Sequence, residues 1–348
     1  MQPSVDPIPT RAPSSAQSAR RRPVEVAAGV LDSLGLLNGV LRIARGRYIM
    51  AYHRVLPPAE AQAEWCHPAI WIRPKTLDEH LGFFSDIGRL VPLHELLEAD
   101  DADGPLFAIT FDDAWIDNLT YAIPVLDAHG AKATFFVPTD AVSTGRLFWT
   151  EELALKIGAA LLGPRGEALI AHFGWPPETC GQGNALLPRL MEFIEQLKEL
   201  PLAEREHSIE RLYAQFGIPT SPVQGRVMTW DQIRSLSAQG HTIGSHSKTH
   251  LILRNVDVAR VDEELVESRR IVEEQIGRPV DCFCFPNARY DAVSSERVLA
   301  AGYRYGFRIH NLKVTRTTHR ALIPRFSASE ANATLPFLKL RFARACLT

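Results

Sequence analysis

The chain contains few cysteines, and their spacing suits neither a disulfide framework nor a structural zinc site. Five occur in 348 residues: Cys66, Cys180, Cys282, Cys284 and Cys346. The number is odd and no Cys-x-x-Cys pair is present, which argues against both arrangements. We therefore expect reduced, partly buried thiols. Cys282 and Cys284 are two apart in an expected strand, so both side chains should point to the same face.

Long apolar runs are also missing. A membrane span requires roughly 18 consecutive apolar residues, and the nearest candidate, 24–44, is interrupted by Glu25, Asp32, Asn38 and Arg42. Residues 1–23 are rich in Pro, Ser and Arg and lack the apolar segment of a secretory signal peptide. We expect a cytoplasmic protein without a signal peptide or a transmembrane span, with the inner membrane face as a further candidate location.

Neither sign of charge is in excess. The chain has 38 Lys and Arg against 40 Asp and Glu, a formal net charge of -2. Nucleic-acid binders usually show a strong basic excess, so we expect no nucleic-acid partner. The hydrophobic fraction of 46% is ordinary for a soluble globular protein and is enough to bury a large core.

The N-terminal region has two expected parts. Residues 1–23 are expected to be a disordered tail, and residues 24–47 an amphipathic helix. Apolar residues recur at intervals of four or three in this helix: Val26, Val30, Leu34, Leu37 and Leu41. Arginines flank it, which would suit peripheral contact with an anionic membrane surface. The alternative is a helix packed on the protein's own core, and the sequence favours that alternative.

From residue 48 the pattern alternates between strands and helices. Short buried strands are expected at 48–52, 107–111, 133–137, 241–245, 281–285 and 303–309. Helices are expected at 229–239, where Thr229 can act as N-cap, and at 257–276, ended by Gly277. Such alternation indicates an α/β fold with a parallel sheet. Between 145 and 224 helical patterns dominate, and we expect a helical insertion that caps one face.

Four polar residues directly follow expected strands: His53, Asp112, Asp113 and His246. Ligands of parallel α/β folds bind at the carboxyl ends of the strands, so these side chains should converge on one rim. Adjacent carboxylates repel each other, and a divalent metal ion is the simplest compensation for the Asp112–Asp113 pair.

The segment His246-Ser247-Lys248-Thr249-His250 strengthens the case for a metal site. Two imidazoles four residues apart can share one ion if they lie on one face of a helical turn. Two histidines and one aspartate leave open positions for water and substrate, as in catalytic sites. We expect zinc in the first place, with cobalt, nickel, manganese or iron as alternatives.

These motifs resemble those of the polysaccharide deacetylase family (the NodB-homology domain, carbohydrate esterase family 4). The segments that carry the resemblance are Ile109-Thr110-Phe111-Asp112-Asp113-Ala114-Trp115, the His246 to His250 segment, Phe283-Cys284-Phe285-Pro286-Asn287, and Tyr52-His53-Arg54-Val55. The last of these is similar to an element of the branch associated with bacterial exopolysaccharide clusters. The resemblance implies a deacetylase domain over residues 48–335, folded as a distorted (β/α)7-type barrel.

The resemblance also implies roles for single residues. Asp113, His246 and His250 would be the metal ligands, and Asp112 the general base. A backbone N–H near Asn287, after Pro286, would stabilise the oxyanion. Trp115 and Trp149 could stack on a sugar ring, or they could fill the core.

The chain departs from the family pattern at three positions. Ala114 replaces the glycine that usually follows the aspartate pair, a change expected only to tighten the turn. Cys284 stands where many members have an arginine that orients the base, and Arg289 or Arg325 could substitute for it. No late histidine fits the role of the acid, so His53 is the better candidate, with a core histidine as the alternative.

The expected function is a metal-dependent N-deacetylase acting on an N-acetylated glycan: a polysaccharide, an oligosaccharide or a precursor. Three alternatives remain open from the sequence. The first is an amidohydrolase of the same fold acting on a non-sugar amide, and the second is a catalytically silent carbohydrate-binding homologue. The third is a membrane-associated scaffold.

Overall fold

The computed structural model describes residues 15–43, 46–100, 104–181, 183–254 and 256–347. The chain forms two compact units. The barrel unit comprises Arg22–Pro58, Pro68–Arg146 and Gln224–Thr348. The helical unit comprises Ala59–His67 and Leu147–Val223, together with the described part of Met1–Arg21.

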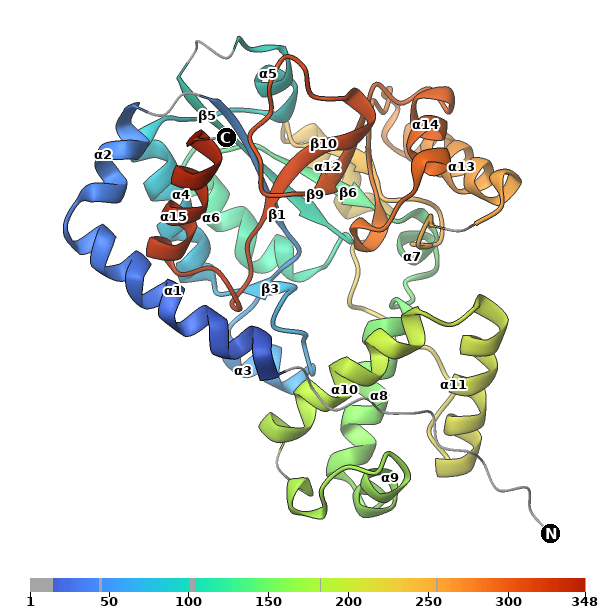
Figure 1. Ribbon diagram of the computed structural model, residues 1–348. Coiled ribbons are helices and arrows are strands. Elements are labelled where there is room, and N and C mark those ends of the chain that lie inside the picture. The colour runs from blue at the N-terminus through green and yellow to red at the C-terminus, as the bar shows by residue number, and fades with distance from the viewer. Residues whose placement is uncertain (1–14, 44–45, 101–103, 182, 255, 348) are drawn as a thin grey trace. The chain divides into compact units, whose positions relative to one another are not determined.

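Seven parallel strands of the barrel unit close into a barrel within the described residues (Figure 1). In spatial order they are β1 (Gly46–Tyr52), β10 (Ile323–Ser327), β9 (Tyr305–Ile309), β8 (Cys282–Cys284), β7 (Thr242–Ser245), β6 (Ala133–Val137) and β5 (Pro105–Asp112). The barrel closes because β5 pairs with β1 from Gly46↔Pro105 to Tyr52↔Phe111. The expected distorted (β/α)7-type barrel is confirmed.

Helices follow most strands and lie on the outside of the barrel. α4 lies against β4, α13 against β7 and α14 against β9 (Figure 1). After β1, the further elements of this unit are β2 (Arg54–Val55), β3 (Trp71–Ile72), α4 (Pro74–Ile87), β4 (Arg89–Leu90), α5 (Leu93–Glu98), α6 (Ile123–Ala128), α7 (Thr139–Thr144), α12 (Trp230–Ala238), α13 (Val258–Ile276), α14 (Ala292–Ala300) and α15 (Leu335–Leu347). Short helical turns are η1 (Asn118–Ala122), η3 (Pro286–Ala288) and η4 (Arg320–Leu322).

Helix starts follow the capping residues that the sequence indicated. Thr229 caps α12 by a capping box with Gln232. The Asp257 side chain accepts a hydrogen bond from the Arg260 backbone N–H at the start of α13, and Gly277, at φ 67°, ends that helix. Both expected helices are therefore confirmed to within a residue or two at each end.

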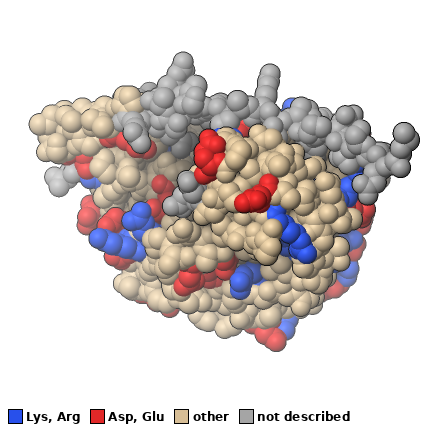
Figure 2. Space-filling model, turned by 90° about the horizontal axis from the view of Figure 1, so that it is seen from below, with Lys and Arg blue, Asp and Glu red and all other residues tan. Residues whose placement is uncertain are grey.

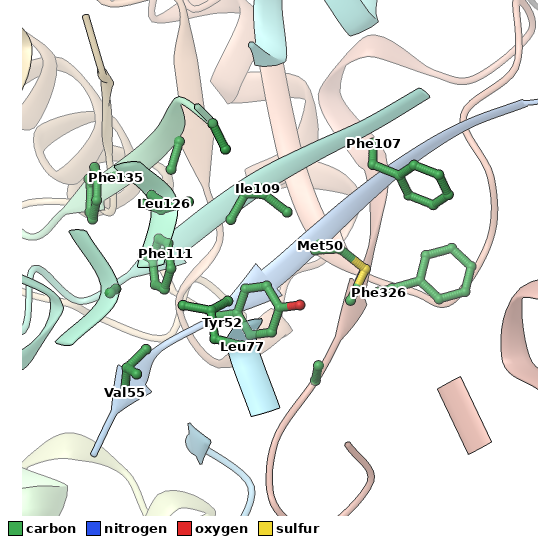
Figure 3. Packing of buried hydrophobic residues seen from close by; sticks show 14 of the residues in the cluster. Met50, Tyr52, Val55, Leu77, Phe107, Ile109, Phe111, Leu126, Phe135 and Phe326 are labelled. Atoms are coloured by element: carbon green, nitrogen blue, oxygen red, sulfur yellow. The ribbon is translucent and has the colours of Figure 1, made fainter. Parts of the chain in front are cut away.

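The alternation of side chains along each strand separates two apolar clusters. Met50 and Tyr52 of β1 point outward to a cluster that also includes Phe111 of β5 and Leu77 of α4 (Figure 3). Tyr48 of β1 belongs to the same cluster. Alternate residues of six strands meet in a second cluster, as only a barrel interior allows: Ile49, Leu106, Ala108, Phe136, Cys282, Cys284, Phe307 and Ile323. Cys282 and Cys284 thus share a face, as expected.

The strand β7 contributes a glycine to this interior for a steric reason. A Cβ on Gly244 would lie 2.6 Å from Cδ1 of Phe136 and 3.1 Å from the Cys282 carbonyl oxygen. The barrel therefore closes around Phe136 only if residue 244 has no side chain. The same alternation directs Thr110 and Asp112 of β5 inward, because they follow Leu106 and Ala108 at intervals of two.

The helical unit has its own apolar core. Its elements are α8 (Trp149–Leu162), α9 (Gly166–His172), η2 (Pro177–Thr179), α10 (Gly183–Lys198) and α11 (Leu202–Phe216). Trp65 lies buried in this core, and a Cβ on Gly158 would lie 2.3 Å from the indole. α3 (Pro58–Ala63) and Trp65 belong to a segment that the sequence did not associate with residues 145–224. That this unit caps one face stays a prediction.

The N-terminal region differs from the expectation. Helix α1 (Ser15–Ser33) begins within the segment expected to be a disordered tail, and residues 1–14 of that tail lie outside the described residues. The residues from Ala16 to Arg22 are mostly good helix formers, which outweighs the Pro and Ser content of the tail as a whole. Gly35, at φ 71°, separates α1 from α2 (Leu36–Ile43), so 24–47 is not a single helix.

The surface carries no dominant charge on the face drawn in Figure 2, where Lys and Arg side chains are interspersed with Asp and Glu among uncharged residues. Within the described part of the chain, no helix is both long enough and apolar enough to span a bilayer.

Candidate metal centre and catalytic residues

The loop after β7 carries His246 and His250, and it is not helical. Ser247 and His250 have φ values of 64° and 59°, so the expected helical turn is wrong. Two left-handed residues instead fold the loop back, and the two imidazole centroids lie 4.9 Å apart. The spacing of four therefore brings the histidines together by a loop conformation that the sequence pattern does not encode.

Glu264 of α13 holds this loop in place. Its carboxylate accepts hydrogen bonds from the backbone N–H groups of Lys248 at 2.9 Å and Thr249 at 2.8 Å, and from the Thr249 hydroxyl at 2.7 Å. Arg260 neutralises it from one turn away, at 2.9 Å. Glu264 is fully buried, and sequence reasoning missed it because it lies within an ordinary amphipathic helix.

Asp113 lies opposite both histidines. Its Oδ1 is 3.3 Å from Nε2 of His246 and 3.2 Å from Nε2 of His250. Its Oδ2 accepts a hydrogen bond of 3.2 Å from the indole N–H of Trp115. Although Oδ1 is buried, it accepts no hydrogen bond from any described residue. A buried carboxylate oxygen without a donor is costly unless a cation compensates for it.

The tautomer of His246 supports a cation at this point. Nδ1 of His246 lies 2.8 Å from the carbonyl oxygen of Cys284, and a carbonyl can only accept, so Nδ1 donates. Nε2 therefore faces the Asp113 carboxylate and needs a positive charge between them, either a metal ion or a proton. Without a metal, burial is outweighed by Cys284 and Asp113, which hold the pKa of His246 well above its usual value. A carbonyl that fixes the ring in this way is typical of metal-ligating histidines.

The pKa of Asp113 reflects the same arrangement. Burial raises the pKa of this carboxyl. The hydrogen bonds and charges of His246 and His250 lower the pKa by more than burial raises it, and hold it well below its usual range. Two imidazole nitrogens and one carboxylate oxygen lie within 4.8 Å of one another. This donor set fits a divalent metal ion with open coordination positions.

Asp112 has different partners from its neighbour. Arg325 of β10 donates from Nη1 to Oδ1 and from Nη2 to Oδ2, both at 2.7 Å. Both side chains are almost fully buried. Burial raises the pKa of Asp112, but the Arg325 guanidinium outweighs it, and the pKa is lowered. Asp112 is therefore anionic and fixed in orientation.

Arg325, and not Arg289, is the arginine that orients Asp112. It also donates to the Thr110 hydroxyl at 2.8 Å and to Sγ of Cys284 at 2.7 Å. Asp112, His246 and Cys284 form a second group of candidate metal ligands. The Arg325 guanidinium contacts two of them, Asp112 and Cys284. The positive charge of Arg325 disfavours a cation there and leaves the Asp113 triad as the better metal site.

His53 follows β1 at the same end of the barrel, as expected. Its Nε2 lies 3.8 Å from Oδ2 of Asp112, and its Nδ1 is buried without a hydrogen-bond partner among the described residues. The side chain is 19% exposed. The backbone carbonyl of His53 accepts a hydrogen bond from Asn118 at 2.8 Å, which fixes the strand end.

The residues expected to contact substrate differ in their exposure to solvent. Pro286 is buried and Asn287 is exposed in η3, directly after β8 and therefore at the same end of the barrel. Trp115 is fully buried, and the Arg54 guanidinium lies 4.1 Å from its ring centroid. Trp115 thus offers no open ring face to a sugar, and it orients Asp113 instead.

Trp149 belongs to the helical unit. The guanidinium of Arg205 lies 4.4 Å from its ring centroid within that unit. Its proposed stacking on a sugar stays a prediction.

Strained backbone is concentrated at the strand ends that carry these groups. Most of the non-glycine residues with positive φ in the described chain lie after β5, β7 and β8, among them Asp113, Ala114, Ser247, His250 and Asn287. Residues held in such conformations cluster at functional sites. Ala114 adopts a conformation that suits glycine, with φ 55°, and the expected tightening of the turn stays a prediction.

Three solved structures show where else this fold occurs. The Streptococcus pyogenes deacetylase PplD in complex with acetate has a TM-score of 0.56 and 14% identity, with 87% of this chain and 99% of that chain covered. IcaB from Ammonifex degensii has a TM-score of 0.53 and 16% identity, with 87% and 98% covered. A de-N-acetylase from Aggregatibacter actinomycetemcomitans has a TM-score of 0.55 and 15% identity, with 84% and 98% covered. Identities this low show a shared fold.

No curated protein matches the sequence of this chain. The family model described as polysaccharide deacetylase matches residues 99–172 and 193–306, which is more than half of the chain. That match includes the Asp112–Asp113 pair and the His246 to His250 loop. The chain therefore belongs to the polysaccharide deacetylase family, a family of hydrolases that act on carbon–nitrogen amide bonds.

Proposed function

We propose that the protein is a metal-dependent N-deacetylase that removes acetyl groups from N-acetylated amino sugars of a polysaccharide, an oligosaccharide or a precursor. The observation that carries the proposal is the division of labour between two adjacent carboxylates. Asp112 is fixed by Arg325, whereas Asp113 turns an unpaired oxygen toward two imidazole nitrogens. A protein that only binds sugar needs neither a fixed base nor a metal site beside it.

Asp113, His246 and His250 would hold the ion, with zinc as the first candidate and cobalt, nickel, manganese and iron as alternatives. When bound, a divalent ion supplies a Lewis acid that polarises the acetamide carbonyl and makes water easier to deprotonate. The Cys284 carbonyl keeps Nε2 of His246 available as a ligand, and Glu264 keeps the loop in its ligating conformation.

Asp112 would act as the general base. It takes a proton from the attacking water while the oxygen of that water forms a bond to the amide carbon. Both oxygens of Asp112 accept from Arg325, so the carboxylate cannot rotate away from the site. The hydrogen bonds keep it anionic and therefore competent to accept the proton at neutral pH.

His53 would act as the general acid. When the carbon–nitrogen bond breaks, the electron pair goes to the amine nitrogen, which needs a proton to leave. Nε2 of His53 is 3.8 Å from Asp112, so the proton donor and the base lie on the same rim. The products are acetate and the free amino sugar, and the water supplies the atoms that balance the reaction. The N–H groups near Asn287 would stabilise the oxyanion.

The substrate assignment rests on two supports. The element Tyr52-His53-Arg54-Val55 resembles the exopolysaccharide branch of the family. One solved structure of the same fold is described as a de-N-acetylase. We propose an N-acetylated glycan as the partner, no nucleic acid, and a cytoplasmic location.

The test is acetate release from N-acetylglucosamine oligomers by protein stripped of metal and reloaded with zinc or cobalt. Asp112→Asn and His246→Ala serve as inactive controls. We expect release that depends on metal and is lost in both variants. Metal binding without release would point to a non-sugar amide. If the protein neither binds metal nor releases acetate, the catalytically silent carbohydrate-binding homologue becomes the preferred function.

A further inference from the structure

The apolar side of helix α1 faces outward. Surface helices of soluble proteins normally turn apolar side chains to the core, yet Val26, Val30 and Leu34 are 68%, 53% and 66% exposed. They recur at intervals of four and therefore form one stripe along the helix. Leu36, at the start of α2, extends the apolar surface with 55% exposure.

The opposite side of α1 carries its two acidic residues, Glu25 and Asp32, both of which are partly buried. Ala28 is fully buried, and Asp32 lies one turn further along the same side. Asp32 is bound to Lys339 of α15 at 2.8 Å, and the side chains are 19% and 9% exposed. The helix is therefore anchored to the barrel unit by Ala28, by the Asp32–Lys339 ion pair and by Leu31, which packs partly buried against the core, while other apolar side chains of the helix stay exposed. Packing on the protein's own core, which the sequence favoured, therefore holds for the side that carries Leu31 and leaves the side that carries Val26, Val30 and Leu34 exposed.

The stripe, defined here as Val26, Val30, Leu34 and Leu36, has a charge environment that favours one kind of partner. Between residues 23 and 36, all of which are described, no exposed residue is acidic. Arg20, Arg21 and Arg22 precede the stripe in α1. An apolar stripe that three arginines precede in the sequence fits the boundary between the headgroups and the acyl chains of an anionic bilayer.

We propose that this stripe is a membrane-docking surface that rests the enzyme on anionic phospholipid. The part of α1 that belongs to the barrel unit lies at the periphery of that unit in Figure 1. Leu37, which the sequence grouped with this stripe, is 5% exposed and belongs to the core. The docking surface thus comes from α1 and the first residue of α2. It acts independently of the metal centre.

The test is co-sedimentation of the full-length protein with vesicles of phosphatidylcholine alone and of phosphatidylcholine mixed with phosphatidylglycerol. We expect binding to the mixed vesicles that weakens as salt is raised, because anionic headgroups attract the arginines. Val30→Asp should lower the vesicle partition coefficient by about tenfold or more. Changing Arg20, Arg21 and Arg22 to Gln should weaken binding to the mixed vesicles alone.

Val266→Asp is the matched control, because Val266 of α13 is 47% exposed in the same unit and receives the same charge. It should leave vesicle binding unchanged. Both aspartate variants should keep wild-type acetate release from soluble oligomers, which shows that they are folded. The proposal fails if the wild-type protein sediments with neither kind of vesicle, or if both variants lose binding equally. It also fails if Val30→Asp converts a dimer to a monomer without any vesicle binding, since the stripe would then join two copies.

Discussion

Arg325 donates two parallel hydrogen bonds of 2.7 Å to the Asp112 carboxylate, and its Nη2 also lies 2.7 Å from the thiol sulfur of Cys284. The guanidinium therefore occupies the space beside the residue that replaces the arginine of the third family motif. The contact to Asp112 that the family resemblance led us to expect from the position of Cys284 is made here by Arg325 of β10.

We predict that Arg325→Met lowers kcat/KM by roughly a hundredfold, because a general base that is no longer oriented loses much of its contribution. Metal content should stay near wild type, since Arg325 touches no residue of the Asp113 triad in a hydrogen bond. The variant leaves a buried carboxylate unpaired, which costs about 3–5 kcal/mol. Circular dichroism must therefore show a folded protein, and Arg325→Lys provides a milder second variant.

The exchange of arginine positions gives a sharper version of the same prediction. Cys284→Arg alone should be inactive, because two guanidinium groups would compete for one carboxylate. Combined with Arg325→Met, the same change should recover part of the lost activity. Rates measured for the two single variants and the double variant form a cycle. If the double variant is no better than the worse single variant, the strands are not interchangeable donors.

Substitutions of the adjacent residues Asp112 and Asp113 should have different effects on metal content and activity. Asp112→Asn should retain metal and lose activity by roughly 10²–10⁴, the usual contribution of a general base. Asp113→Asn should lose metal, because it removes the carboxylate ligand between His246 and His250. Metal content by atomic spectroscopy, measured beside acetate release, separates the two. Equal metal loss in both variants would contradict the assignment of base and ligand.

Chelation extends this prediction to stability. Removing the metal from the wild-type protein should lower the melting temperature, since an ion that binds only the folded state stabilises it by mass action. The same treatment should leave the melting temperature of Asp113→Asn unchanged.

How far the sequence could predict this site is best seen from Arg325 and His246. Asp112 follows a strand of consecutive apolar residues, and its position at the rim could be derived from that pattern alone. Arg325 lies in β10, a strand of five residues that contains Pro324 and has no clear period. Its pairing with β1 and β9 comes from barrel closure, which depends on contacts distant in sequence. The sequence could therefore offer Arg289 and Arg325 but could not choose between them.

Other differences have similar causes. The His246–His250 pair was correctly grouped, but its loop depends on two residues held at positive φ by Glu264, and no local propensity encodes that. Trp115 has the composition of a stacking residue and lost that role through burial beneath Arg54. Burial of an aromatic side chain depends on tertiary packing, so a motif alone does not reveal it.

Glu264 should matter for metal binding without touching the metal. We predict that Glu264→Ala lowers metal affinity by about 10–100-fold, because residues that support ligands have effects of that size. Glu263→Ala is the matched control: the neighbouring Glu263 also pairs with Arg260, and with the Lys248 side chain of the loop, but it is 41% exposed and makes no bond to the loop backbone. Competition with a fluorescent chelator measures both affinities. Equal losses in the two variants would show that helix charge, rather than loop geometry, is responsible.

His80 should give the fold a pH-dependent component of stability. The ring is fully buried; its Nε2 donates to the Ala333 carbonyl at 2.7 Å, so Nδ1 accepts from the Tyr52 hydroxyl at 3.0 Å. Burial lowers the pKa of His80 from 6.5 to about 4. Because the folded state resists protonation, this stabilisation is fully present above pH 6.5, the ordinary value in the unfolded chain. It is lost as the pH falls toward about 4, by roughly 3 kcal/mol in total.

The measurement compares wild type with His80→Gln in urea unfolding between about pH 8 and about pH 5, where roughly 2 kcal/mol of this term should disappear. Gln can keep one of the two hydrogen bonds and does not titrate, so the variant should be less stable at about pH 8 and lose less on acidification. Subtracting the two curves cancels the contribution of the metal centre, which both proteins share. Parallel curves would mean that His80 accepts a proton in the folded state as readily as in the unfolded chain. Burial would then not hold the ring neutral.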